Sequence, residues 1–350
     1  MPPRQRGSPS PCGNRCRLAA SSSCDARQHR ASDANNDLPR RNAAPICMKH
    51  ALAPRDLLLT LAVVTLLGFT FVPIKVGLRE LPPFALAALR FFFAAVPLVL
   101  VIRRPRMPWP DVVGYGLAIG VFQFGLLFLG IKLGMPAGLS SLIIQVQVFF
   151  TIGLAIAFLG DHFQRHNLIG AVVATAGIAV LALQSLIEGA HATLVGFALV
   201  LVAAFAWGVG NVIAKRAAAA HDADMFSLVV WSSLVPPVPL ALLSYVFEGG
   251  ASAWHAVASA GMLTWGCVFM LAWGATLFGF ASWARLLHRY PTGLIAPFAL
   301  LIPVSGIASC AIFLGESLAP LQAIGGALVF AGLAENVYGP RIRAWMSRAR

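Results

Sequence analysis

From residue 57 onward the chain is a succession of apolar runs of about 20 residues, separated by short loops. A helix rises about 1.5 Å per residue, so a run of this length crosses a hydrocarbon core of about 30 Å. Because backbone polar groups in lipid must be satisfied internally, the runs predict an all-α integral membrane fold. The ten predicted transmembrane helices are 57–78, 83–102, 112–131, 136–158, 168–187, 194–214, 226–247, 262–284, 292–314 and 318–337.

Composition excludes an ordinary soluble protein. The chain is 58% hydrophobic and only 11% charged, which leaves too little polar surface for a soluble domain. Its formal net charge of +13 lies in loops and tails, where lipid headgroups and topology explain it, so we expect no nucleic-acid partner. The sequence has no P-loop, H-E-x-x-H or G-x-S-x-G motif. We therefore expect no enzyme, no catalytic residue, no metal site and no cofactor.

Basic residues indicate the orientation. With the N-terminus in the cytoplasm, the outer loops hold only Arg79 and Lys132. The cytoplasmic segments then hold Lys49, Arg55, Arg103, Arg104, Arg106, Arg165, Lys215, Arg216, Arg285, Arg289, Arg341, Arg343, Arg348 and Arg350. By the positive-inside rule, this asymmetry predicts a multi-pass protein of the cell (inner) membrane with both termini in the cytoplasm.

The apolar part of the chain contains an internal repeat. Leu133–Asp161 aligns without a gap on His288–Glu316, 155 positions later, and the same offset relates Gly170 to Gly325 and Gly177 to Gly332. Before the outer segment 248–261, which holds the extra length, the offset is 140 to 142, as between Val96-Pro97-Leu98 and Val238-Pro239-Leu240. Each half has five helices, an odd number, so equivalent helices run in opposite directions. Two inverted five-helix repeats are typical of transporters.

The chain divides into four parts on this basis. Residues 1–47 are rich in Arg, Ser and Pro and lack apolar periodicity, which indicates a disordered extension or a mis-called start before Met48. The first repeat is 55–187, the second is 194–339, and 340–350 is a basic cytoplasmic tail.

Several short stretches occur in a fixed order along both repeats. They are Ile74–Leu78, Leu89–Phe91, Gly114–Leu117, Gln123–Phe124, Gly134–Leu139, Gln145–Thr151, Trp207–Asn211 and Ser227–Ser232. In this combination the chain resembles, over about residues 55–339, the EamA-type transporters of the drug/metabolite transporter superfamily. The resemblance implies a ten-helix inner-membrane exporter of O-acetylserine, cysteine and related amino acids.

Arg90 is the first candidate for substrate binding, because ionisable residues at membrane depth are costly and often functional. Its guanidinium suits a carboxylate, although it could also extend towards the membrane surface or clamp backbone carbonyls. Lys75 is a second candidate cation, but it lies one turn from a helix end, where snorkelling explains it as well. Trp231 and Ser232 occupy the positions equivalent to Leu89 and Arg90, which makes them candidates for an opposite wall.

Mid-helix amides form a second group of candidates. Gln123, Gln145 and Gln147 could line a cavity or join helices, and at most one of the last two can face a given cavity. Trp207 and Asn211 form one stripe with Lys215, at intervals of four residues. Small residues at Gly116/Gly120, Gly130/Gly134 and Gly134/Gly138 have the spacing that permits close helix approach.

The sequence favours a secondary transporter that exports a small polar, amino-acid-like metabolite by alternating access, with membrane lipid as its surroundings. The alternative is a duplicated scaffold that handles lipid-linked or other substrates, or a non-transporting interaction protein. No carboxylate lies at mid-membrane depth in the predicted helices. Proton coupling and oligomer formation are therefore left open.

Overall fold

The computed structural model describes residues 53–160, 165–187, 191–221, 224–290 and 292–348, and every regular element within these ranges is helical. The predicted extension 1–47 lies outside them. The helices are α1 (Pro54–Phe69), α2 (Phe71–Glu80), α3 (Pro83–Val99), α4 (Trp109–Tyr115), η1 (Gly116–Phe124), α5 (Gly125–Lys132), α6 (Ala137–Ile143), η2 (Ile144–Val146), α7 (Gln147–Leu159), α8 (Arg165–Ile187), α9 (His191–His221), α10 (Met225–Ser232), α11 (Pro237–Phe247), α12 (Ala251–Ser259), α13 (Met262–Phe269), η3 (Met270–Gly279), α14 (Phe280–Arg289), α15 (Thr292–Ile295), η4 (Ala296–Leu300), α16 (Leu301–Leu314) and α17 (Pro320–Arg348).

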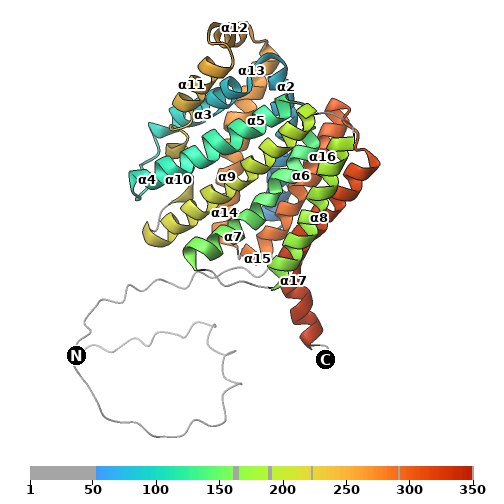
Figure 1. Ribbon diagram of the computed structural model, residues 1–350. Helices are drawn as coiled ribbons and strands as arrows, with labels where there is room; N and C mark the ends of the chain where they lie inside the picture. Colours follow the sequence, from blue (N-terminus) through green and yellow to red (C-terminus); the bar gives the residue numbers. More distant parts are fainter. Residues whose placement is uncertain (1–52, 161–164, 188–190, 222–223, 291, 349–350) are drawn as a thin grey trace, which may run out of the picture. The chain divides into compact units, whose positions relative to one another are not determined.

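Several of these helices follow one another without a loop and form longer segments that cross the bundle (Figure 1). Among the described residues, seven segments are long and apolar enough to span a membrane. They are Pro54–Glu80, Trp109–Lys132, Ala137–Leu159, Asn167–Gln184, Leu194–Ala217, Met225–Phe247 and Met262–Trp283. Two shorter apolar helices, Pro83–Val99 and Phe298–Leu314, lie at two other predicted spans. The all-α membrane fold is confirmed, while the count of ten transmembrane helices stays a prediction.

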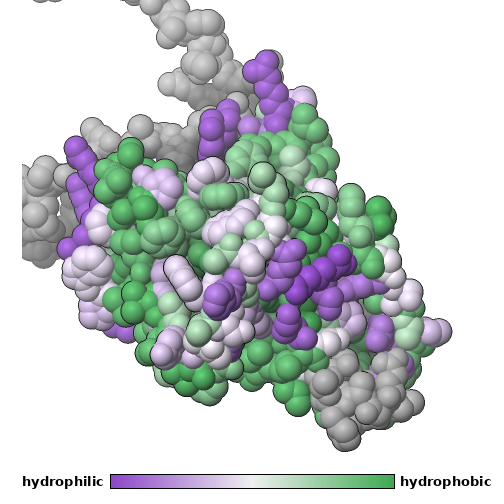
Figure 2. Space-filling view, turned by 90° about the horizontal axis from the view of Figure 1, so that it is seen from above, coloured by the Kyte–Doolittle hydropathy of each residue, from purple (hydrophilic) through white to green (hydrophobic). Residues whose placement is uncertain are grey.

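The outer surface of the bundle is apolar. Leu100 is 85% exposed and Met262 is 90% exposed, and many other large hydrophobic side chains face outward. Figure 2 shows hydrophobic residues over much of the visible surface, with hydrophilic residues gathered in a few patches. A soluble protein rarely exposes apolar area on this scale, so the surface agrees with a lipid environment.

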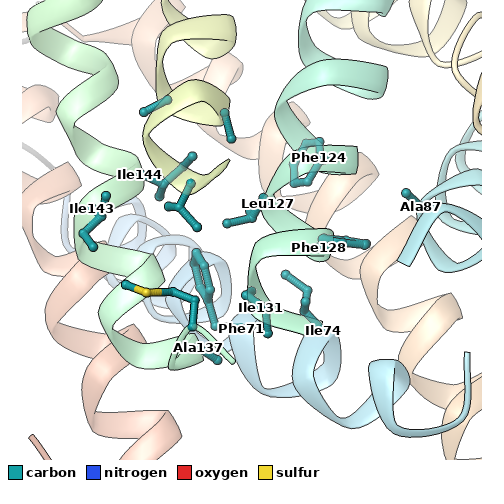
Figure 3. Packing of buried hydrophobic residues seen from close by; sticks show 14 of the residues in the cluster. Phe71, Ile74, Ala87, Phe124, Leu127, Phe128, Ile131, Ala137, Ile143 and Ile144 are labelled. Atoms are coloured by element: carbon teal, nitrogen blue, oxygen red, sulfur yellow. The ribbon is translucent and has the colours of Figure 1, made fainter. Parts of the chain in front are cut away.

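The interior is packed by side chains from several helices of both repeats. Phe71 and Ile74 of α2 meet Leu127 and Phe128 of α5 in the main buried cluster (Figure 3). Phe128 and Ile74 are almost completely inaccessible. The same cluster includes residues of α3, α6 and α9, so it joins the two halves into one core.

Acidic side chains at the two ends of the segment α1–α2 contact the two ends of the segment α13–α14. At one end, here called the Asp56 end, Asp56 accepts a 2.6 Å hydrogen bond from the hydroxyl of Tyr290 and forms a 3.2 Å ion pair with Arg289. At the other, the Glu80 end, Glu80 accepts a 2.8 Å hydrogen bond from the amide of Gly261, just before α13. The segments α1–α2 and α13–α14 are therefore joined at both ends.

Two further carboxylates cap helices that belong to the other repeat. Glu248, which follows α11, accepts hydrogen bonds of 2.8 and 3.3 Å from the amides of Phe84 and Ala85 at the start of α3. Glu316, which follows α16, accepts bonds of 3.0 and 2.8 Å from the amides of Ala137 and Gly138 at the start of α6. A carboxylate at a helix N-terminus satisfies free N–H groups and complements the helix dipole.

The two repeats meet closely along α8 and α17, which lie side by side (Figure 1). A Cβ on Gly170 would lie 2.6 Å from the carbonyl oxygen of Gly332, and one on Gly177 would lie 2.6 Å from that of Gly325. Because Gly170 is equivalent to Gly325 and Gly177 to Gly332, each contact is the repeat-related copy of the other. A pair of contacts related in this way is expected where two inverted repeats pack against each other.

Some local details differ from the sequence prediction. Gly116 and Gly120 do permit close approach, since a Cβ on Gly120 would overlap the ring of Pro236. Gly134, however, lies in the turn between α5 and α6 with a φ of 103°, so it does not form a helical pair with Gly130 or Gly138. The segment 248–261 contains a helix, α12, and α17 continues as far as Arg348 through the predicted basic tail.

Candidate functional site

A narrow cavity lies between α3, the segment α4–η1, the C-terminal end of α10 and the segment η3–α14. Its lining residues are Phe91, Tyr115, Gly116, Ile119, Gly120, Phe124, Val229, Ser232, Ser233, Pro236, Thr276 and Phe280. The space holds about one water molecule. Aromatic rings and small residues make up most of the wall, and four hydroxyl-bearing side chains, Tyr115, Ser232, Ser233 and Thr276, supply polar groups.

Both π-helices of the described chain contribute to this cavity. Their ranges, Gly116–Phe124 in η1 and Met270–Gly279 in η3, correspond at the repeat offset of 155, apart from the first residue of η3. A π-helix widens the turn and is uncommon, and it frequently occurs at functional sites. Its presence at the same place in both repeats identifies this region as the candidate site.

Arg90 is completely enclosed beside the cavity. It is 2% exposed, and its guanidinium carbon lies 3.8 Å from the centre of the Phe124 ring. Its Nε donates a 3.1 Å hydrogen bond to the hydroxyl oxygen of Thr276. Its Nη1 is buried without a hydrogen-bond partner. Since Phe91, Phe124 and Thr276 line the cavity, Arg90 lies in the layer immediately behind its wall.

Gln123 provides a second unsatisfied polar atom. It lies on η1 next to Phe124, is 1% exposed, and its Oε1 is buried without a partner. Among the described residues, only this oxygen and Nη1 of Arg90 are buried side-chain polar atoms in that condition. Leaving such atoms unpaired costs about 1–3 kcal/mol each, so both are expected to gain a partner from a ligand or water.

Of the two candidates on α10, Ser232 lines the cavity and Trp231 does not. The hydroxyl of Ser232 donates to the carbonyl of Val229 at 3.2 Å. The indole N–H of Trp231 instead donates to the carbonyl of Ile102 at 3.0 Å, and its ring packs edge-on against Trp109. The structure therefore brings together Arg90 and Ser232, the two equivalent positions, and directs Trp231 towards a loop.

The remaining amides connect helices. Gln147 of α7 accepts a 2.7 Å hydrogen bond from Asn211 of α9, and Asn211 also donates to the hydroxyl of Thr151 at 3.0 Å. Gln145 donates to the carbonyl of Ala299 at 3.4 Å. None of the three is a lining residue of the cavity.

Three other candidates lie away from the cavity wall. Trp207 packs, partly buried, against the main hydrophobic cluster. Lys75 is half-buried on α2, and Lys215 is exposed on α9. The candidate stripe Trp207, Asn211 and Lys215 thus does not line this cavity.

Some lining residues were absent from the sequence-based candidates. Tyr115 and Phe124 stand inside stretches that resemble the transporter family, so the sequence contained a signal for them. Thr276 and Phe280 lie in an apolar run with no polar or charged neighbour in sequence, and only the packing of η3 against α3 places Thr276 beside Arg90.

Comparison with known proteins agrees with this architecture. The model of the EamA-like transporter family matches the chain twice, at residues 55–183 and 194–337. A probable amino-acid metabolite efflux pump of Salmonella typhimurium is 42% identical over 293 residues, which cover 83% of this chain and 98% of that protein. A probable terminal-alkyne amino-acid exporter of Streptantibioticus cattleyicolor is 29% identical, covering 79% and 90%. One crystal structure shares the fold, with a TM-score of 0.55, 20% identity, and coverage of 81% and 95%.

Proposed function

Because the chain belongs to the EamA-like transporter family, whose model matches both of its repeats, we propose that it exports small amino acids or their metabolites. O-acetylserine, cysteine and related compounds are the proposed substrates, and alternating access is the proposed mechanism. The names of its relatives support this substrate class, since one is a probable amino-acid metabolite efflux pump and another a probable amino-acid exporter.

The observation that carries the proposal is the pair of unsatisfied polar atoms, one on Arg90 behind the cavity wall and one on Gln123, the neighbour in sequence of the lining residue Phe124. Nη1 of Arg90 is a cationic donor, and Oε1 of Gln123 is an acceptor. An amino acid carries a carboxylate that would satisfy the first and an ammonium that would satisfy the second. Phe124, adjacent to Gln123 in the chain, stacks on the guanidinium, so the two groups belong to one part of the bundle.

The dimensions of the cavity support a mechanism that requires movement. A space for about one water molecule cannot hold an amino acid, so binding needs a state in which the helices around η1 and η3 separate. Two repeats that can exchange conformations would open the site alternately to each side. The contacts of Asp56 and Glu80 with the two ends of the segment α13–α14 are the proposed closures.

Ser232 and Ser233 complete the proposed site. Both hydroxyls donate to the carbonyl of Val229, at 3.2 and 2.6 Å, which leaves their lone pairs for a ligand donor. The aromatic rings of Phe91, Phe124 and Phe280 would exclude water from a small side chain. Gln145, Gln147, Asn211, Trp207, Trp231 and Lys75 remain proposals for a more open state only.

We place the protein in the cell (inner) membrane with both termini in the cytoplasm. Residues 104–110 then lie on the cytoplasmic side and residues 248–260 on the outer side. Reporter tags inserted in these two segments are expected on opposite sides of the membrane. Tags on the same side would contradict both the orientation and the inverted arrangement.

The function is tested by overexpression in a bacterial strain that lacks its own cysteine exporters. The expected result is greater tolerance to cysteine and more cysteine and O-acetylserine in the medium. Arg90→Ala should abolish this export while the protein still inserts, whereas Arg103→Ala, which changes an exposed loop cation, should export as the wild type does. Unchanged tolerance and unchanged medium content with the wild-type protein would contradict the proposed function.

A further inference from the structure

Thr276 contacts Arg90 from within the π-helix η3. Its hydroxyl donates a 3.0 Å hydrogen bond to the carbonyl oxygen of Leu271, five residues earlier in η3. The same oxygen accepts the 3.1 Å bond from Nε of Arg90. Because its proton is engaged with the helix backbone, the hydroxyl presents a lone pair to the guanidinium.

This bond determines which edge of the guanidinium is available. A carboxylate can bind an arginine along the edge that contains Nε or along the edge formed by the two terminal nitrogens. Thr276 occupies Nε, and the Phe124 ring covers one face at 3.8 Å. The terminal edge remains, and its Nη1 is the atom without a partner.

On the basis of the proposed function, we propose that Thr276 is a positioning residue for the substrate carboxylate. It holds Arg90 so that Nη1 and Nη2 together face the carboxylate, and it makes the site specific for acids over neutral analogues. Arg90 belongs to the first repeat and Thr276 to the second, so the anion site is assembled from both halves.

The first repeat shows that the hydroxyl is not required for the π-helix itself. At the offset of 155, the equivalent of Thr276 is Val121, which lies in η1, and η1 is a π-helix with valine at that position. At the offset of 142 that holds before segment 248–261, the equivalent of Arg90 is Ser232. The hydroxyl therefore occurs only in the π-helix of the repeat that does not contain the arginine, and the helix geometry alone does not explain it.

The experiment compares an acid with its neutral amide in inverted membrane vesicles that export radiolabelled serine. Serine and serinamide compete with the label in wild-type, Thr276→Val and Thr276→Ser proteins. The valine substitution keeps nearly the shape of threonine and introduces the residue that the first repeat has at this position. The serine substitution keeps the hydroxyl. We expect T276V to weaken competition by serine about tenfold and to change that by serinamide less than twofold, while T276S stays within about threefold of the wild type for both.

Each outcome decides the inference. An unchanged preference for serine over serinamide in T276V overturns it, as does an equal loss of both competitors, which would mean a purely structural role. In both cases wild-type export leaves the proposed function standing. Absence of serine export by the wild type overturns the inference, while the proposed function is decided separately by the export of cysteine and O-acetylserine in the overexpression assay. If T276V does not reach the membrane, Thr276→Ala replaces it in the same comparison.

Discussion

Gly177 of α8 lies so close to Gly325 of α17 that a Cβ on Gly177 would be 2.6 Å from the carbonyl oxygen of Gly325. Real side chains do not approach backbone at that distance, so the two helices can adopt this spacing only with glycine at the contact. Small residues at helix interfaces allow close packing in lipid, where no hydrophobic force drives helices together. The contact therefore fixes how α8 packs against α17.

Gly177→Ala is expected to lower the free energy of unfolding by about 1–3 kcal/mol, because the new methyl group must push α17 away. The measurement is the thermal unfolding midpoint of the detergent-solubilised protein. Gly153→Ala is the matched control, since Gly153 is also in a helix but a Cβ there would meet nothing within 4 Å. The control should be neutral or stabilising by up to about 1 kcal/mol, and equal losses in both variants would contradict the packing argument.

Tyr290→Phe is expected to destabilise the Asp56 end more than Arg289→Gln does. The tyrosine hydroxyl donates at 2.6 Å to Asp56 and accepts at 3.2 Å from the amide of Ala53, and Tyr290 is buried. Arg289 is 43% exposed, and exposed ion pairs contribute about 0–1 kcal/mol. A hydrogen bond to a charged group contributes about 1.5–3 kcal/mol. The measurement is the unfolding midpoint of both variants at low and at high salt. The loss of stability should be larger for Tyr290→Phe, and only that of Arg289→Gln should disappear in high salt.

Gln123→Leu is expected to raise stability and lower transport at the same time. The substitution removes a buried oxygen without a partner, which costs the folded protein about 1–3 kcal/mol. It also removes the proposed acceptor for the substrate ammonium. Measuring the unfolding midpoint together with the export KM tests both effects in one variant. A destabilised variant with normal export would show that the amide is structural.

Asp224→Asn is expected to change the acid sensitivity of the start of α10. Burial raises the pKa of Asp224, but hydrogen bonds from the hydroxyl and amide of Ser227 and the amide of Phe226 outweigh it and leave the pKa below its ordinary value of 3.8. A lowered pKa in the folded state stabilises the protein above the ordinary value, and this contribution is lost as the pH falls.

Asparagine caps helices about as well as aspartate, so Asp224→Asn should resemble the wild type at neutral pH and should lack the acid-dependent part of the loss. Asp224→Ala should cost about 1 kcal/mol at neutral pH. Unfolding midpoints between pH 7 and about pH 3 provide the check. Identical pH profiles for the wild type and the asparagine variant would mean that the carboxylate charge contributes nothing.

The fold was largely predictable because hydrophobic length and repetition are properties of the sequence itself. The apolar runs coincide with the helical segments, and the repeat offset had already related Gly170 to Gly325 and Gly177 to Gly332, the four glycines that meet between α8 and α17. The site was less predictable. Arg90 and Ser232 could be selected because a charge at membrane depth is rare and because the repeat relates the two positions.

The sequence could not show how each helix is rotated about its own axis or how it is aligned along its neighbours. Gln147 and Asn211 are 64 positions apart, and their hydrogen bond depends on how α7 and α9 turn towards each other. Thr276 lies on η3, a π-helix that packs against α3, and neither the π-helix nor this packing could be predicted from the apolar run that contains it. The helix α12 fills a segment that had been identified only as extra length.

The paired glycine contacts between α8 and α17 have a consequence for mutational robustness. If the two halves were separate but identical five-helix chains, a change at one glycine would alter both contacts at once, because the same glycine would take part in both. In the fused chain Gly170, Gly177, Gly325 and Gly332 are encoded separately, so a single mutation damages only one contact and leaves its counterpart intact. Because the two halves are fused in one chain, each of the two glycine contacts between α8 and α17 can change without the other.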